Sequence, residues 1–468
     1  MSSKLKLGLL WSIIEVVIKR TLDFVVKLIL ARLLFPEDFG VIGMATVFIS
    51  FIQVLNDGGM GPAIIQKRNL TQKHLNTVFW TNVFWSLFLY SLLSFGVAPF
   101  VSNFYNQPIL SKIIPFLSLS ILTSALNTVH FALLRRDLKF KQIAIIRNVS
   151  SLIGGCYAVY LALFDFGIWA LVANEIVACM VSVPLFYNKS RWIPKLQWNS
   201  KILKEVVSFG VFVTGTKVIM NIVSNIDYLI IGKWIGAAAL GYYTLAFMMT
   251  NLVSGQITSM LDTVMFPFYS TIQNDINKLK AYYLKLIGYY ALLIYPIMLT
   301  LILFAEDLIN LFFGEKWGEV VLPLRVLALA VMINVLTSGY NLLFRSTGNP
   351  KYEFKIQQIT SLAVYLPCIL IGVYSYGVVG AATGILLSKI INIFVHLHVL
   401  NKYFKIQGFE IFKQVYKIIV LCLVTSVVVL LLRLLRIDNQ LIFVVYILTL
   451  SISYIKIFKN KLIILLKK

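Results

Sequence analysis

The sequence has few charged residues for its length. Asp, Glu, Lys and Arg make up 13% of the 468 residues, whereas a soluble domain carries about a quarter. Apolar residues make up 59%, and the mean hydropathy is +0.86. They fall in continuous stretches, and a membrane-spanning helix needs ~20 such residues. This composition excludes a soluble enzyme, with or without a single anchor, and predicts an all-α polytopic membrane protein.

Residues that carry enzyme or metal chemistry are also scarce. The four histidines are scattered, the four cysteines have no C-x-x-C spacing, and the G-x-x-x-x-G-K-[ST] phosphate-binding loop is missing. We therefore expect no catalytic residues, no metal, no cofactor and no direct use of ATP. The net charge of +23 would suggest nucleic acid for a soluble protein. In a membrane protein basic residues determine topology, so we expect no nucleic acid as a partner.

The apolar stretches are long enough for about 14 transmembrane helices. They lie at 7–31, 39–66, 75–101, 109–134, 142–164, 166–187, 203–231, 239–268, 280–304, 318–343, 355–375, 377–400, 413–433 and 438–457. The first lacks an A-x-A-like cleavage site and is expected to be a membrane helix. Basic clusters occupy alternate loops, which predicts that both termini are cytoplasmic. Arg433 and Arg436 do not fit this alternation.

Four short motifs recur in the same order with offsets of 201 to 210 residues. The pairs are Asp57-x-x-x-x-Pro62 with Asp262-x-x-x-x-Pro267, Phe39-Gly40 with Leu240-Gly241, Leu133-Leu134-x-Arg136 with Leu342-Leu343-x-Arg345, and Phe166-Gly167-Ile168-Trp169 with Tyr376-Gly377-Val378-Val379. Six spans per copy make a parallel repeat, which is typical of alternating-access transporters. We predict six-helix lobes at 1–190 and 191–405, followed at 406–468 by two extra helices and a basic cytoplasmic tail.

The first predicted helix carries charges that cannot all face lipid. Glu15, Lys19, Asp23 and Lys27 recur every four residues and share one stripe, with Arg20 beside them. Exposing these five groups to lipid would cost on the order of 12–17 kcal/mol. The stripe is therefore a ladder of internal pairs or the wall of a polar cavity. A third alternative is that this helix lies in the interface and does not span the membrane.

Further polar residues lie within predicted spans. The seventh span carries a polar face made of Thr214, Lys217, Asn221, Ser224, Asn225 and Tyr228, with Asp227 near its outer end. Glu175 and Lys389 are also at mid-membrane depth, whereas Arg147 is close enough to the inner interface to snorkel. These residues either pair with one another across the lobes, bind substrate or carry protons.

Several longer motifs resemble those of one exporter family. They are Asn225-Ile226-Asp227-Tyr228-Leu229-Ile230-Ile231-Gly232, Leu240-Gly241-Tyr242-Tyr243-x-Leu245-Ala246, Phe266-Pro267-Phe268-Tyr269-Ser270, Phe313-Gly314-Glu315-Lys316-Trp317 and Tyr376-Gly377-Val378-Val379-Gly380-Ala381. From about residue 5 to 400 the chain resembles the polysaccharide-export branch of the multidrug/oligosaccharidyl-lipid/polysaccharide exporter superfamily. Its similarity is greatest to the Wzx-type flippases of colanic, teichuronic and O-antigen assembly. The resemblance implies flipping of an undecaprenyl-pyrophosphate-linked oligosaccharide from the inner to the outer leaflet of the bacterial inner membrane.

That cargo suggests roles for the polar residues. A diphosphate needs cations, for which Lys19, Arg20, Lys217 and Arg147 are the candidates, and Asn221, Asn225 and Tyr228 suit sugars. The remaining charges, Glu15, Asp23, Lys27, Glu175, Asp227 and Lys389, are assigned to charge pairing or to coupling with a proton or sodium gradient. Asp227 has helix capping or loop anchoring as an equal alternative. Expected partners are the lipid-linked oligosaccharide, membrane lipids, and a glycan polymerase with its chain-length proteins.

Three alternatives remain open. A lipid-II or drug exporter of the same superfamily would share the fold and differ in cargo. A membrane glycan polymerase or ligase generally carries a large external loop, whereas the longest polar external stretch of this chain runs only from Ala305 to Glu319. A scaffold within a glycan assembly complex would leave the intramembrane charges without a purpose.

Overall fold

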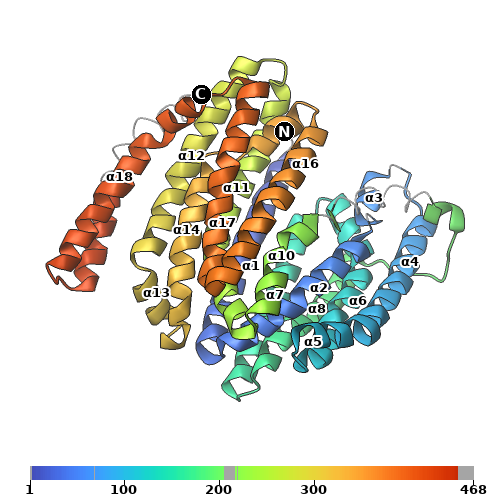
Figure 1. Cartoon of the computed structure of the whole chain (residues 1–468). Coiled ribbons are helices and arrows are strands. Elements are labelled where there is room, and N and C mark those ends of the chain that lie inside the picture. Colours follow the sequence, from blue (N-terminus) through green and yellow to red (C-terminus); the bar gives the residue numbers. More distant parts are fainter. Residues whose placement is uncertain (1–2, 59, 68, 205–216, 219, 452–468) are drawn as a thin grey trace. The chain divides into compact units, whose positions relative to one another are not determined.

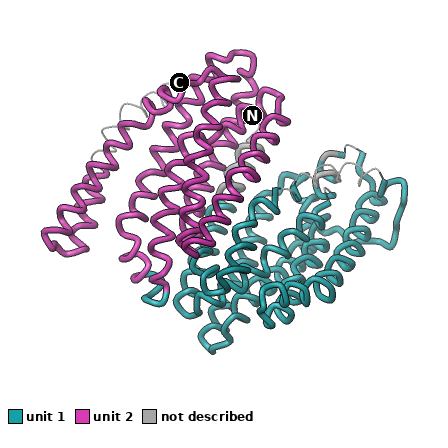
Figure 2. The backbone as a smooth tube through the Cα atoms, in the orientation of Figure 1, with its two compact units in different colours: residues 1–244, 312–316 teal, residues 245–311, 317–468 magenta. Residues whose placement is uncertain are grey.

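The computed structural model describes residues 3–58, 60–67, 69–204, 217–218 and 220–451. The regular elements of these residues are helices (Figure 1). They form two compact units, which Figure 2 shows in different colours. Unit 1 contains residues 1–244 and 312–316, and unit 2 contains residues 245–311 and 317–468. The predicted all-α polytopic fold is confirmed.

Nine helical segments of the described residues are long and apolar enough to cross a membrane. They are Pro36–Asp57, Gln72–Tyr105, Ile109–Arg136, Phe140–Leu163, Ile168–Ser190, Ile276–Leu303, Glu315–Ser346, Pro350–Phe404 and Gly408–Leu434. Pro350–Phe404 covers two predicted spans, because the backbone leaves the helical conformation at Tyr376 and Gly377. Asn439–Ser451 is a shorter apolar helix.

Two further predicted spans coincide with long helices. The charged α1 (Ser3–Leu33) and α11 (Ala237–Thr271) cover the first and the eighth. The seventh span falls partly on residues 205–216, so Thr214 lies outside the described residues, as does the tail beyond residue 451. The number of 14 spans stays a prediction.

Unit 1 is built around four long helices. They are α1, α6 (Ile109–Arg136), α7 (Phe140–Leu163) and α8 (Ile168–Ser190). Helix α7 contacts α1 and α8, and α6 contacts α8. The other elements of this unit are α2 (Pro36–Asp57), α3 (Met60–Gln66), α4 (Gln72–Ser91), η1 (Leu92–Val97), α5 (Ala98–Tyr105) and α10 (Ile226–Trp234). Helices α2 to α5 contact α6, and α10 contacts α2.

Unit 2 is a second helical bundle. Its long helices are α12 (Ile276–Leu303), α14 (Val321–Val335), α17 (Leu366–Phe404) and α18 (Gly408–Leu434). Helix α12 contacts α14 and α18, and α14 contacts α17. The shorter elements in this part of the chain are α13 (Ala305–Phe312), η2 (Glu315–Val320), α15 (Tyr340–Ser346), α16 (Pro350–Ile359) and η3 (Thr360–Tyr365). The extra helix α18 therefore packs on the bundle through α12.

Two glycines that the repeat pairs have the same unusual backbone conformation. Gly167 has φ 54° and ψ −131°, and Gly377 has φ 58° and ψ −131°. Residues with a Cβ rarely adopt these angles, because the side chain clashes with the backbone. Each glycine marks the turn into a helix at the matching place in its half. The repeat therefore extends from residue type to local backbone geometry.

A second repeated pair makes a reciprocal contact within unit 1. A Cβ added to Gly40 would overlap the carbonyl oxygen of Ala237, and one added to Gly241 would overlap that of Pro36. The offset that pairs Gly40 with Gly241 also pairs Pro36 with Ala237. When the two halves of the repeat are interchanged, each contact becomes the other, as happens across a two-fold interface. The lobe boundaries at residues 190 and 405 follow the repeat and stay a prediction.

Candidate functional site

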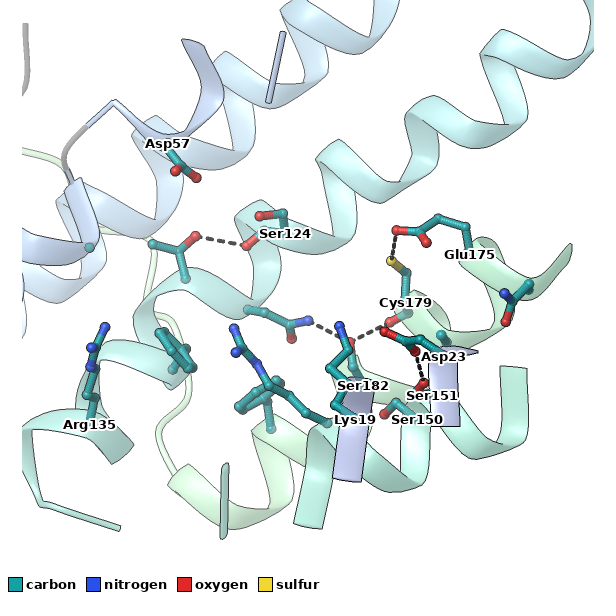
Figure 3. A pocket seen from close by; sticks show the side chains of 18 of the residues that line it. Lys19, Asp23, Asp57, Ser124, Arg135, Ser150, Ser151, Glu175, Cys179 and Ser182 are labelled. Atoms are coloured by element: carbon teal, nitrogen blue, oxygen red, sulfur yellow. Dashed lines mark hydrogen bonds between the residues drawn. The ribbon is translucent and has the colours of Figure 1, made fainter. Parts of the chain in front are cut away.

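A polar cavity of about 640 Å³ opens within unit 1 (Figure 3). Its wall is formed by α1, α2, α3, α6, α7 and α8, together with Lys217. The lining residues are Lys19, Asp23, Lys27, Asp57, Gly61, Ser124, Asn127, Thr128, Phe131, Arg135, Arg147, Ser150, Ser151, Asn174, Glu175, Ala178, Cys179, Ser182, Phe186 and Lys217. This volume is that of a small-molecule site, so it can hold a polar headgroup.

Helical periodicity brings these side chains onto the cavity wall. In α6 the lining positions Ser124, Thr128, Phe131 and Arg135 are spaced by three or four residues, which places them on one helix face. Helices α7 and α8 contribute lining residues with the same spacing. The polar faces of α6, α7 and α8 thus turn away from lipid and toward one another.

The charged stripe of α1 faces α7 and the cavity. Lys19, Asp23 and Lys27 line the cavity. Asp23 accepts a hydrogen bond of 2.7 Å from Ser151 of α7. Glu15 is buried, and its Oε1 lies 3.0 Å from Nη1 of Arg147. These contacts favour the cavity-wall interpretation of the stripe over a ladder that pairs only within α1.

Basic side chains outnumber acidic ones on the cavity wall. Its basic residues are Lys19, Lys27, Arg135, Arg147 and Lys217, and its acidic residues are Asp23, Asp57 and Glu175. The formal charge of the lining is therefore +2. Nζ of Lys217 lies 3.5 Å from Oδ2 of Asp57, and both side chains are about half exposed. Such a loose pair leaves the ammonium able to take a second anionic partner.

Two buried oxygen atoms of the lining lack a hydrogen-bond partner among the described residues. They are Oδ1 of Asn127 and Oγ of Ser150. Asn127 uses its amide nitrogen to donate a bond of 2.8 Å to Ser182. A buried polar atom without a partner costs about 1–3 kcal/mol. Either side chain would have to turn toward the cavity before a bound ligand could satisfy its atom.

The structure places Arg20, Asn221 and Asn225 outside the cavity lining. Arg20 is exposed, because it is one residue, about 100° of helix, away from Lys19. Asn221 accepts a hydrogen bond of 3.3 Å from Ser50 of α2. Asn225 donates one of 2.8 Å to the carbonyl of Asn221. Both asparagines thus bond within the protein, and the assignment of all three residues to substrate stays a prediction.

Asp227, Tyr228 and Lys389 also lie away from this lining. Asp227 is fully buried at the start of α10 and accepts a hydrogen bond from the hydroxyl of Tyr243 in α11. Tyr228 meets the ring of Tyr243 edge to face, with centroids 5.7 Å apart. This geometry favours the anchoring role for Asp227. Lys389 belongs to α17 in unit 2, and its coupling role stays a prediction.

Several residues that line the cavity are not among the site residues predicted from the sequence. Arg135 fits the pattern of a basic loop, and Asp57 is a marker of the repeat. Phe131 and Asn127 have no role in either pattern. The signal that could have found them is the spacing of Ser124, Asn127, Phe131 and Arg135, which puts polar and aromatic side chains on one face of an apolar helix.

The fold is similar to that of a flippase and of a transporter of known structure. Over 97% of this chain and 100% of the other, it is similar to the lipid II flippase MurJ in an inward closed conformation, with a TM-score of 0.77 and 18% identity. It is also similar to a multidrug resistance MATE family transporter of the MOP superfamily in an inward-facing conformation. That match has a TM-score of 0.65 and 15% identity, and covers 84% of this chain and 98% of the other. These likenesses show the fold.

The chain belongs to the family described as polysaccharide biosynthesis proteins, whose pattern matches residues 29–322. It is 25% identical to the lipopolysaccharide biosynthesis protein WzxC of Escherichia coli, over 84% of this chain and 80% of WzxC. It is 25% identical to the succinoglycan biosynthesis transport protein ExoT of Rhizobium meliloti, over 68% and 65% of the two chains. The predicted family is confirmed.

Proposed function

We propose that this protein moves a lipid-linked oligosaccharide, joined to its polyprenyl carrier through a diphosphate, from the inner to the outer leaflet of the bacterial inner membrane. The observation that carries the proposal is a cavity with a net positive charge and unsatisfied polar atoms. It occurs in a chain that belongs to a family of polysaccharide biosynthesis proteins. The cavity suits a charged and hydroxylated headgroup, while the apolar carrier chain stays in lipid.

We assign different tasks to the basic and the acidic side chains of the cavity. Lys19, Lys217 and Arg147 would bind the diphosphate, because charge-assisted hydrogen bonds to phosphate are about twice as strong as neutral ones. Glu15 would hold Arg147 in place, and Asp57 would be a loose partner that Lys217 can exchange for phosphate. Asp23 and Glu175 are the cavity carboxylates that a coupling proton or sodium ion would use.

The distribution of basic loops supports a proposed orientation of the protein in the membrane. The loop between α6 and α7, with Arg135, Arg136, Lys139 and Lys141, lies at the cytoplasmic face if the positive-inside rule holds. Both termini are then cytoplasmic. A glycan polymerase and chain-length proteins would receive the cargo on the other side.

The direct test is to deplete the protein in its host and profile lipid-linked glycans by mass spectrometry. We expect one complete diphosphate-linked repeat to accumulate in the inner leaflet, and wild-type protein to restore the original profile. Outer-leaflet accumulation of finished but unpolymerised repeats would indicate a polymerase or ligase. Accumulation of lipid II would assign the cargo to peptidoglycan synthesis. An unchanged profile would contradict the proposal and favour drug or ion export.

A further inference from the structure

Two arginines of the cavity share one aromatic ring. The guanidinium carbon of Arg147 lies 4.8 Å from the ring centroid of Phe131, and that of Arg135 lies 5.9 Å from the same centroid. Both distances are within the range of cation–π attraction. Phe131 therefore holds two positive groups, one from α6 and one from α7, near a single point of the cavity wall.

Among the residues that the structure describes, a carboxylate neutralises only one of the two guanidinium groups. Arg147 pairs with the buried Glu15 at 3.0 Å. Arg135 has no carboxylate partner in the part of the chain that the structure describes, and it is exposed to the cavity. Figure 3 shows Arg135 at the opposite side of the pocket from the acidic Glu175. The region around Phe131 is thus the part of the lining with the most unbalanced positive charge.

Arg136, the residue after Arg135, has the contacts expected of an arginine with a structural role. Arg136 is turned toward α3, where its Nη1 donates hydrogen bonds to the backbone carbonyls of Ile64, at 3.0 Å, and Lys67. It satisfies carbonyl groups that the end of a helix leaves without partners. Arg135 makes no comparable contact with another helix among the described residues. Its long side chain is therefore not explained by packing of the fold.

The internal repeat also distinguishes Arg135 from Arg136. Arg136 corresponds to Arg345, which forms a two-pronged pair with Glu353 at 2.6 to 3.0 Å. Arg135 corresponds to Phe344, whose side chain is almost fully buried. The structural arginine is thus present in both halves, whereas the cavity arginine is present in the first half only. A residue that the fold needs would be expected in both halves.

The depth of the two arginines fits the headgroup of an inner-leaflet lipid. Arg135 is in the last turn of α6. Arg147 is seven residues into α7, or about 10 Å at 1.5 Å per residue. Lys19 and Lys217 belong to other elements of the wall. A lipid diphosphate that enters from the inner leaflet would therefore meet the arginine pair at its own depth.

We propose that Arg135 and Arg147, held together by Phe131, form the docking site for the diphosphate of the incoming carrier lipid. The proposal rests on the proposed function and adds to it the place where the diphosphate first binds. Guanidinium groups suit this task because their planar forks bind phosphate oxygens in pairs. A diphosphate would also supply the anionic partner that Arg135 lacks.

Binding of farnesyl diphosphate tests the docking site without knowledge of the glycan. The full chain is placed in phosphatidylcholine nanodiscs, and the affinity is measured for wild type, Arg135→Gln and Arg135→Lys. The matched control is Lys139→Gln, which removes one charge from the same loop outside the lining, where Lys139 pairs with Asp137 at 2.8 Å. We expect Arg135→Gln to weaken binding about tenfold or more, Arg135→Lys less, and Lys139→Gln less than twofold. Equal thermal stability of the variants shows that they are folded.

The other outcomes separate this site from the proposed function. If wild type binds farnesyl diphosphate and Arg135→Gln binds it equally well, the docking site is wrong while the proposed function stands. If Lys139→Gln weakens binding as much as Arg135→Gln does, the loss of affinity comes from the general positive charge of the loop. That result would overturn the site. Competition by phosphatidylglycerol in the nanodisc, but not by inorganic pyrophosphate, would assign the arginines to bulk phospholipid and overturn it as well. If depletion of the protein leaves the lipid-linked glycans unchanged, that result bears on the proposed function alone.

Discussion

Replacing Gly40 by Ala tests the reciprocal glycine contact of unit 1. In a helix this change normally stabilises by about 0.5–1 kcal/mol, because alanine loses less backbone entropy on folding. At Gly40 the new methyl group would lie well below 3.0 Å from the carbonyl of Ala237. A backbone carbonyl in a helix cannot rotate away as a flexible side chain can. The helices must therefore separate, at a cost of about 1–3 kcal/mol or more.

Gly43→Ala is the matched control, one turn further along α2. A methyl group there would meet Leu240 and Thr244 at 3.4 Å, which is an ordinary contact. The measurement is the fraction of each purified variant that stays monodisperse after heating in detergent. We expect Gly40→Ala and Gly241→Ala to lower the midpoint by similar amounts, and Gly43→Ala to leave it unchanged or raise it. Equal stability of Gly40→Ala and Gly43→Ala would refute the close contact.

Three further changes have defined outcomes. Lys217→Ala should abolish glycan export in a complementation assay while the protein level stays normal, because the cavity loses a cation that faces the substrate; wild-type export would remove Lys217 from the site. Gly377→Ala should lower the midpoint of heat inactivation, since it forces a Cβ into a conformation that costs about 1–3 kcal/mol, whereas Gly255→Ala, which meets open space, should not. Tyr243→Phe should destabilise by about 1–3 kcal/mol, because the fully buried Asp227 loses a donor; a midpoint equal to that of wild type would show that the bond is unimportant.

Much of the fold could be predicted because membrane helices follow simple rules. Apolar length predicted the long helices. The charge stripe of α1 predicted a polar cavity as one of three interpretations, since charged groups in lipid are costly. The repeat was visible in four motifs, and the structure adds matching backbone angles at Gly167 and Gly377. Each of these features depends on residues close together in the sequence, or on one helix face.

The cavity wall could be predicted only in part, because it depends on which helices are neighbours. Arg135 lies at a helix end, where the positive-inside rule accounts for a basic residue whether or not it lines a cavity. Spacing put Asn221, Asn225 and Tyr228 on a polar face, but it could not tell which neighbour covers that face. Contacts between α1 and α7, such as Glu15 with Arg147, are likewise not encoded in local spacing.

Reconstituted transport of the accumulated lipid-linked glycan is the decisive test of flipping. The lipid isolated from depleted cells is incorporated into liposomes on one leaflet, with or without the purified protein. Exposure of the glycan on the other leaflet is then followed by cleavage with an added glycosidase. We expect wild type to expose the glycan and Lys217→Ala to behave like protein-free liposomes. Exposure no faster with wild type than in protein-free liposomes would contradict the proposed function.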